Sequence, residues 1–239
     1  MNLTEFLSAA SEAWTLLAAH PLRWIAVVVV FLLAVESLMF IPYVGFVIKL
    51  AVAGVVVPQI IAMFAAASQG QLPIPSAMLG AFSVPLNTML VLVAAALIPF
   101  AGGVAFLYAK GGWQAIEFFF GNVFKVKPPP AHLFEQFKYV MQLLAIPFTL
   151  LAGAVVVKGL VGLGAASAAV SAAVTNWLPV LVIGALAFVF EWLSAQLPHF
   201  LPKPAAAVLG IALLIAFLAF SFSLTYTVSA RVFRSGTPA

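Results

Sequence analysis

The residues of this chain that could do chemistry are a few ionisable side chains inside apolar segments. Glu36 lies six residues before Pro42, and Lys49 lies seven residues after it. At the helical rise of about 1.5 Å per residue, both side chains are roughly 9–10 Å from a turn at Pro42. An ion pair across a helical hairpin is therefore expected. It either joins the two helices or forms a gate or a proton-coupled site.

Other polar residues follow a similar pattern. Glu191 and Lys203 flank Pro198 and can pair in the same way, although Lys203 can also lie among lipid headgroups. Gln59, directly after Pro58, interrupts an apolar run. The candidate intramembrane polar residues are Glu36, Lys49, Gln59, Glu191 and Lys203.

Weaker polar positions lie elsewhere in the apolar runs. Ser221, Thr225 and Ser229 recur every four residues and therefore share a helix face. Because Ser and Thr in membrane helices usually bond to a carbonyl of the preceding turn, this face is either self-satisfied or part of a solute path. Gln142 lies near the start of another run.

Enzymatic and metal chemistry have little support. The chain contains no Cys and no Asp, which excludes disulfides and thiol catalysis and leaves few carboxylate patterns. His20, His132 and His199 lie far apart without close spacing, so neither a metal nor a haem is expected. We predict no catalytic, cofactor-binding or metal-ligating residues.

The composition indicates that lipid covers most of the surface. Hydrophobic residues make up 65% of the 239 residues, and charged residues only 7%, whereas about 25% are charged in a soluble domain. The net charge is +4, but the basic residues stand singly around apolar segments. This pattern is typical of membrane topology and lipid headgroups, and nucleic acid is not an expected partner.

Six apolar runs are near or above the roughly 20 residues that a helix needs to cross a bilayer. They predict an all-α fold, a polytopic transmembrane bundle that forms a single domain over residues 1–239. Pro99 and Pro147 lie inside runs and are predicted to kink them. The predicted spans are 22–41, 44–68, 84–108, 139–163, 177–197 and 205–230.

Residues 1–20 predict an amphipathic helix outside the spans. Asn2 and Glu5 have the spacing of a capping box. The helix either lies in the membrane interface or packs on its own bundle. Its apolar stripe is formed by Leu3, Phe6, Leu7, Ala10, Trp14 and Leu17.

Residues 111–130 predict a second such helix, either interfacial or re-entrant, which ends in a stiff step at Pro128–Pro130. Small residues from Gly159 onwards predict a smooth helix surface. That surface suits close packing, either inside the chain or against another subunit.

The positive charges leave the membrane orientation open. With six spans both termini share one side, which carries Arg23, Arg231 and Arg234. The positive-inside rule favours a cytoplasmic location for the other side, whereas arginines directly beside the first and last spans favour cytoplasmic termini. The opposite side carries Lys110, Lys125, Lys127, Lys138 and Lys203.

The region from His20 to Phe82 resembles uncharacterised bacterial integral-membrane families, including the YciC-like group. Pro21 and Trp24 open the first span, Ile41-Pro42-Tyr43-Val44-Gly45 forms the hairpin, and Gly70, Pro73 and Gly80-Ala81-Phe82 follow. The resemblance implies a multi-pass protein of the bacterial inner (cytoplasmic) membrane and implies no activity. The chain lacks the charged residues usual between spans two and three.

Two functions remain after these observations. The first is a non-enzymatic accessory or scaffold subunit of a bacterial inner-membrane complex, with membrane lipids and other subunits, or a second copy, as partners. The alternative is a small-solute transporter or channel that uses the Glu36/Lys49 region. It predicts a water-accessible cavity near mid-membrane lined by those groups, whereas a dry, tightly packed interior would count against it.

Overall fold

The structure, a computed structural model, describes residues 1–120 and 128–235, and all regular structure in these ranges is helical. The predicted all-α class is confirmed. The α-helices are α1 (Leu3–Ala19), α2 (Pro21–Ser37), α3 (Gly45–Ala67), α4 (Leu86–Phe120), α5 (Ala131–Ala145), α6 (Leu151–Lys158), α7 (Gly162–Thr175), α8 (Trp177–Phe200) and α9 (Lys203–Ser235). Short 3-10 helices are η1 (Leu38–Phe40), η2 (Pro75–Ser83) and η3 (Ile146–Phe148).

Six helical segments are long and apolar enough to cross a membrane, as expected of a multi-pass membrane protein. The fourth combines α5, η3 and α6. It ends at Lys158 because Gly159 adopts a left-handed conformation, which stops a helix. The segments are Pro21–Phe40, Gly45–Ala67, Leu86–Phe120, Ala131–Lys158, Trp177–Phe200 and Lys203–Arg234.

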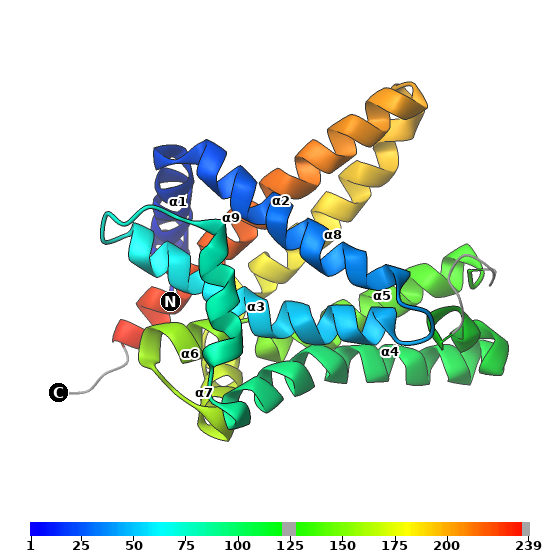
Figure 1. Cartoon of the computed structure of the whole chain (residues 1–239), viewed down its shortest axis with the longest axis horizontal. Helices are drawn as coiled ribbons and strands as arrows, with labels where there is room; N and C mark the ends of the chain where they lie inside the picture. The colour runs from blue at the N-terminus through cyan, green and yellow to red at the C-terminus, as the bar shows by residue number, and fades with distance from the viewer. Residues whose placement is uncertain (121–127, 236–239) are drawn as a thin grey trace.

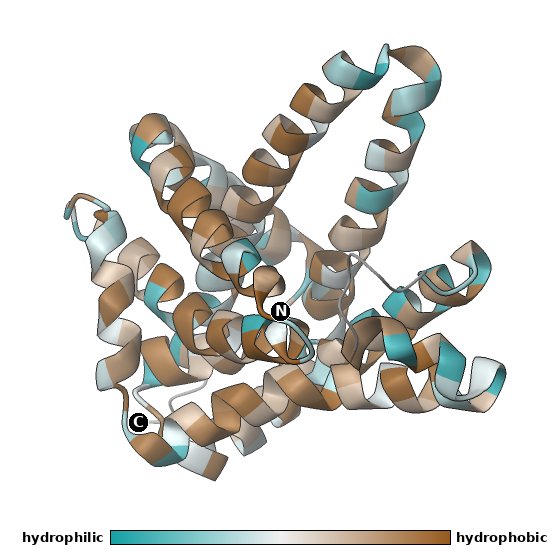
Figure 2. Ribbon diagram, turned by 45° about the vertical axis from the view of Figure 1, so that its right-hand side comes forward, coloured by the Kyte–Doolittle hydropathy of each residue, from teal (hydrophilic) through white to brown (hydrophobic). Residues whose placement is uncertain are grey.

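The membrane-length helices run between two ends of the molecule. In Figure 1, α2, α3 and α4 extend from left to right, the N-terminus, α7 and the end of α9 lie at the left, and the α8–α9 hairpin projects to the upper right. Figure 2 shows hydrophobic residues along most of each helix. Only 11% of the most apolar window is buried in α8 and in α9, against 28–39% in the other four segments. The hairpin is therefore the least enclosed part of the bundle.

The N-terminal helix α1 packs along the C-terminal half of α9. Phe6, Ala9 and Ala13 are buried against the bundle, and the Ser223 hydroxyl donates to the Ala13 carbonyl at 2.9 Å. Leu3, Leu7 and Trp14, half of the predicted stripe, are exposed, because the buried face of α1 is formed by Phe6, Ala9 and Ala13 instead. The helix packs on its own bundle, and its placement in the membrane interface stays a prediction.

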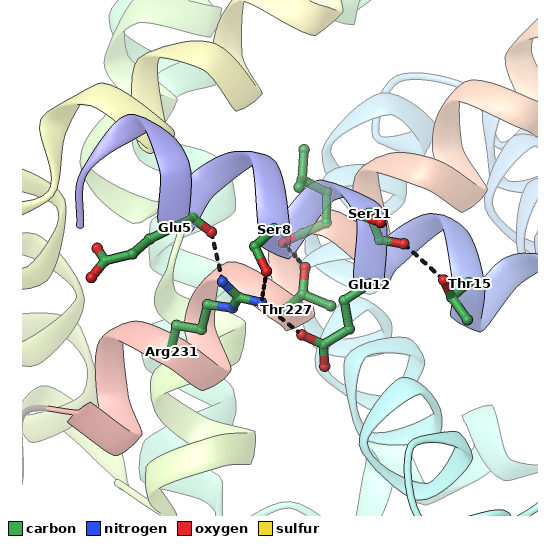
Figure 3. Close-up of polar contacts among 8 residues, drawn as sticks. Glu5, Ser8, Ser11, Glu12, Thr15, Thr227 and Arg231 are labelled. Atoms are coloured by element: carbon green, nitrogen blue, oxygen red, sulfur yellow. Dashed lines mark hydrogen bonds and ion pairs between the residues drawn. The ribbon is translucent and has the colours of Figure 1, made fainter.

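A polar cluster at the end of α9 holds α1 in place. Arg231 donates to the Glu5 carbonyl at 2.7 Å, to the Ser8 hydroxyl at 3.0 Å and to the Glu12 carboxylate at 3.2 Å. Figure 3 shows the guanidinium of α9 pointing at the polar face of α1. The predicted capping box is also present, since Asn2 Oδ1 accepts from the Glu5 amide and Glu5 Oε2 accepts from the Asn2 amide.

Helix α4 reverses direction at Gly112. This residue has φ 65° and ψ −163°, a conformation that only glycine adopts without strain. After it, Trp113–Phe120 folds back beside the first part of α4, so that Phe119 and Phe120 lie 5.7 and 6.4 Å from the Phe100 ring. The described part of the segment predicted over 111–130 thus folds back along α4, and residues 121–127 lie outside the described residues. Whether the segment is interfacial or re-entrant stays a prediction.

The small residues of α7 pack inside the chain. Ala165, Ala169 and Ala173 recur every four residues and are buried in the core cluster that contains Phe6. Of the two uses predicted for the smooth surface, internal packing accounts for this stripe.

Candidate functional site

Glu36 and Lys49 form the ion pair that their spacing predicts. Lys49 Nζ lies 2.7 Å from both carboxylate oxygens of Glu36. The Glu36 side chain is 55% exposed and that of Lys49 is 22% exposed, so the pair lies on the outside of the α2–α3 hairpin. This position suits a link between the two helices.

The other three candidate residues do not form a site together. Gln59 is half-buried and faces η2, where a Cβ at Gly80 would lie 3.4 Å from its Oε1. Lys203 is exposed at the first residue of α9. Glu191 does not pair with it. Instead, Gln142 Nε2 of α5 donates to Glu191 Oε1 of α8 at 3.3 Å.

A cavity of about 490 Å³, the central cavity, lies where α3, α4, α5, η3, α6 and α9 meet. None of the five candidate residues lines the central cavity, so it is not the cavity that the transporter alternative predicts at Glu36 and Lys49. Its walls are mainly apolar. The lining residues include Leu50, Ala53, Val57, Leu92, Ala96, Ala145, Phe148 and Phe222.

Two prolines and one glycine in α3 and α4 shape the walls of the central cavity. Pro58 and Pro99 have no N–H, so the carbonyls of Gly54 and Ala95 lose their usual helical donors, and all four residues line the central cavity. Gly54 also lets α3 approach α4, because a Cβ there would lie 2.9 Å from the Leu92 carbonyl oxygen. The helices therefore touch at Gly54 and leave space beside the contact.

Four polar side chains interrupt the apolar lining: Gln142, Thr149, Ser221 and Thr225. Thr149 bonds to the Ile146 carbonyl at 2.9 Å. Gln142 Oε1 and Ser221 Oγ are buried and have no hydrogen-bond partner among the described residues. A buried polar atom without a partner costs free energy, so these two atoms favour a bound molecule that can donate or accept a hydrogen bond.

A second cavity, the aromatic pocket, measures about 430 Å³ and shares Met141 and Gln142 with the central cavity. Two charged side chains, Lys138 and Glu191, also line it. Lys138 Nζ lies 5.3 Å from the centre of the Phe134 ring. The aromatic walls are Phe46, Phe118, Phe119, Phe134 and Phe137.

The fold and these cavities define a polytopic α-helical protein with a mainly apolar cavity between its helices. No family model, curated protein or solved structure matches the chain. The resemblance to the YciC-like families therefore stays a prediction.

Proposed function

We propose that this chain is a non-enzymatic protein of the bacterial inner membrane that binds an amphipathic, mainly apolar molecule in the central cavity. One observation carries the proposal: a cavity of about 490 Å³ with apolar walls contains the unpartnered Gln142 Oε1 and Ser221 Oγ. Ligand sites commonly measure about 300–1,000 Å³ and combine apolar walls with a few polar groups. The bacterial inner membrane rests on the family resemblance.

The position of the cavity supports a ligand that comes from the bilayer. Each helix that lines it belongs to a membrane-length segment. An apolar molecule dissolved in the membrane reaches such a site without crossing water. The two unpartnered atoms then orient the polar part of the ligand, while the walls accept its chain.

The test is to purify the full chain in mild detergent, extract it with organic solvent and identify the retained molecules by mass spectrometry. Ala53→Phe adds a ring at a half-buried position of the cavity lining and is expected to lower their recovery at least tenfold. Ala94→Phe, on the exposed face of α4, is the matched control and should retain them. Equal recovery from both variants, or no retained molecule in the unaltered protein, would overturn the proposal.

A second candidate is the accessory or scaffold subunit, which the exposed α8–α9 hairpin favours. Trp192, Phe200 and Val208 are 63%, 80% and 71% exposed on this projecting element. Such a surface contacts either lipid or another membrane protein. A gentle affinity pull-down from native membranes tests this: a stoichiometric partner that is lost on Trp192→Ala supports it, and a single isolated species argues against it.

A further inference from the structure

The two cavities lie side by side and together outline one elongated site. Met141 and Gln142 of α5 line both of them. Along α3, the aromatic pocket begins at Phe46 and the central cavity extends to Pro58. The central cavity itself extends along α3 from Leu50 to Pro58, eight residues or about 12 Å of helix. One leaflet of a bilayer has a hydrocarbon thickness of about 15 Å, so the central cavity accepts most of one lipid chain, and the aromatic pocket adds space for a headgroup.

The aromatic pocket lies at the end of this site nearest the Pro42 turn. Phe46 is four residues after Pro42, and Lys138 is in the eighth position of α5. The central cavity lies deeper along both helices. A lipid chain in the central cavity therefore places its headgroup in the aromatic pocket, where the charged side chains are.

The charges of the aromatic pocket are balanced. Lys138 supplies one cation and Glu191 one carboxylate, and neither forms an ion pair with another described residue. Helix α8 approaches α5 at this level, because the Tyr139 and Phe188 rings lie 5.3 Å apart and Glu191 accepts from Gln142. The two charged groups therefore come from two different helices that meet around one pocket.

The geometry points to a zwitterionic phospholipid as the ligand, an inference that rests on the proposed binding function. The ammonium lies near Glu191 and the phenylalanine rings, which attract cations through their faces. The phosphate lies near Lys138, a residue type that commonly binds phosphate as a point charge. The acyl chain occupies the central cavity. An anionic lipid would place negative charge against Glu191, and a lipophilic cation would place positive charge against Lys138.

Competition between two lipids tests this inference. The purified full chain is titrated with phosphatidylethanolamine and with phosphatidylglycerol of identical acyl chains, and bound lipid is counted by native mass spectrometry. We expect at least a tenfold preference for phosphatidylethanolamine. Glu191→Gln removes the carboxylate but keeps the shape of the side chain, so the preference should shift at least tenfold towards phosphatidylglycerol. Lys138→Gln should weaken the binding of both lipids.

Glu135→Gln is the matched control, because Glu135 lies on α5, is exposed and does not line the pocket. It should leave the preference unchanged, and thermal unfolding checks that each variant is folded. Equal binding of the two lipids, or a preference that Glu191→Gln does not change, would overturn the inference and leave the proposed function standing. A preference for phosphatidylglycerol would overturn it in favour of an anionic lipid. If neither lipid binds, both this inference and the proposed function are overturned.

Discussion

Glu36 and Lys49 show what a charged side chain needs in an apolar helix. Each is costly to keep near hydrocarbon without a partner, and each has one at 2.7 Å. Glu36→Gln leaves Lys49 without its carboxylate and should lower the free energy of unfolding by about 1 kcal/mol, because the pair is partly exposed. Replacing both residues with Leu should recover most of that loss. Thermal unfolding in detergent measures both effects, and a double-Leu variant that is no more stable than Glu36→Gln would contradict an interacting pair.

At the residue scale, two helical glycines differ in whether the structure has room for a larger side chain. A Cβ on Gly153 of α6 would overlap the side chain of Ser229 on α9, whereas a Cβ on Gly164 of α7 would have no neighbour within 4 Å. Gly153→Ala should therefore destabilise the protein by about 1–3 kcal/mol through overpacking. Gly164→Ala, the control, should stabilise it by about 0.5–1 kcal/mol through helix propensity. The midpoint of thermal unfolding in one detergent checks both, and equal shifts would refute the close contact of α6 with α9.

Sequence spacing predicts only the polar pairs that a single turn joins. Glu36 and Lys49 are 13 residues apart across one hairpin, and their pairing follows from the helical rise. Gln142 and Glu191 are 49 residues apart and meet through the packing of α5 on α8. The polar residues of the central cavity were visible as Gln142 and as the Ser221 and Thr225 repeat. That these residues line one cavity does not follow from the sequence, because it depends on how α3, α4, α6 and α9 cross.

At the scale of elements, hydropathy predicts the six long helices well, since each needs about 20 apolar residues to cross a bilayer. Conformation at single positions is harder to predict. The reversal of α4 depends on φ 65° at Gly112. A Gly-Gly pair in the sequence indicates a flexible backbone, but it does not predict in which direction the chain turns. The placement of α1 was open for a similar reason: an amphipathic stripe fits a membrane surface and a neighbouring helix equally well.

The attachment of α1 to α9 gives a prediction at this scale. Arg231 makes three hydrogen bonds to α1, so Arg231→Gln should release the first half of that helix. Backbone hydrogen exchange over residues 3–12 should become at least tenfold faster, because local opening costs less when contacts are lost. Arg23→Gln is the control, since Arg23 is exposed at the start of α2. Unchanged exchange in Arg231→Gln would show that Phe6, Ala9 and Ala13 hold the helix without the polar cluster.

At the scale of the whole molecule, the path of the chain fixes which ends share a side. The N-terminus and the end of α9 lie at one end in Figure 1, and α5 begins at the opposite end, because Trp113–Phe120 returns only partway along α4. A topology reporter after Ala239 and another inserted at Pro129 should therefore give opposite signals. This result does not depend on which end faces the cytoplasm. The sign of the Ala239 signal then decides between the two orientations that the Lys and Arg distribution leaves open.

The same pair of reporters tests the re-entrant shape of Trp113–Phe120. If the segment after Gly112 crossed the membrane completely, Pro129 would lie on the side of the termini, and the two signals would agree. A third reporter within Gly70–Pro73 is the control, because this loop lies at the same end as the N-terminus and the end of α9 in Figure 1 and should match Ala239. Six spans and one returning half-helix require that the reporter in Gly70–Pro73 gives the same signal as the one after Ala239. The reporter at Pro129 must give the opposite signal. Agreement of all three positions would contradict the reversal at Gly112.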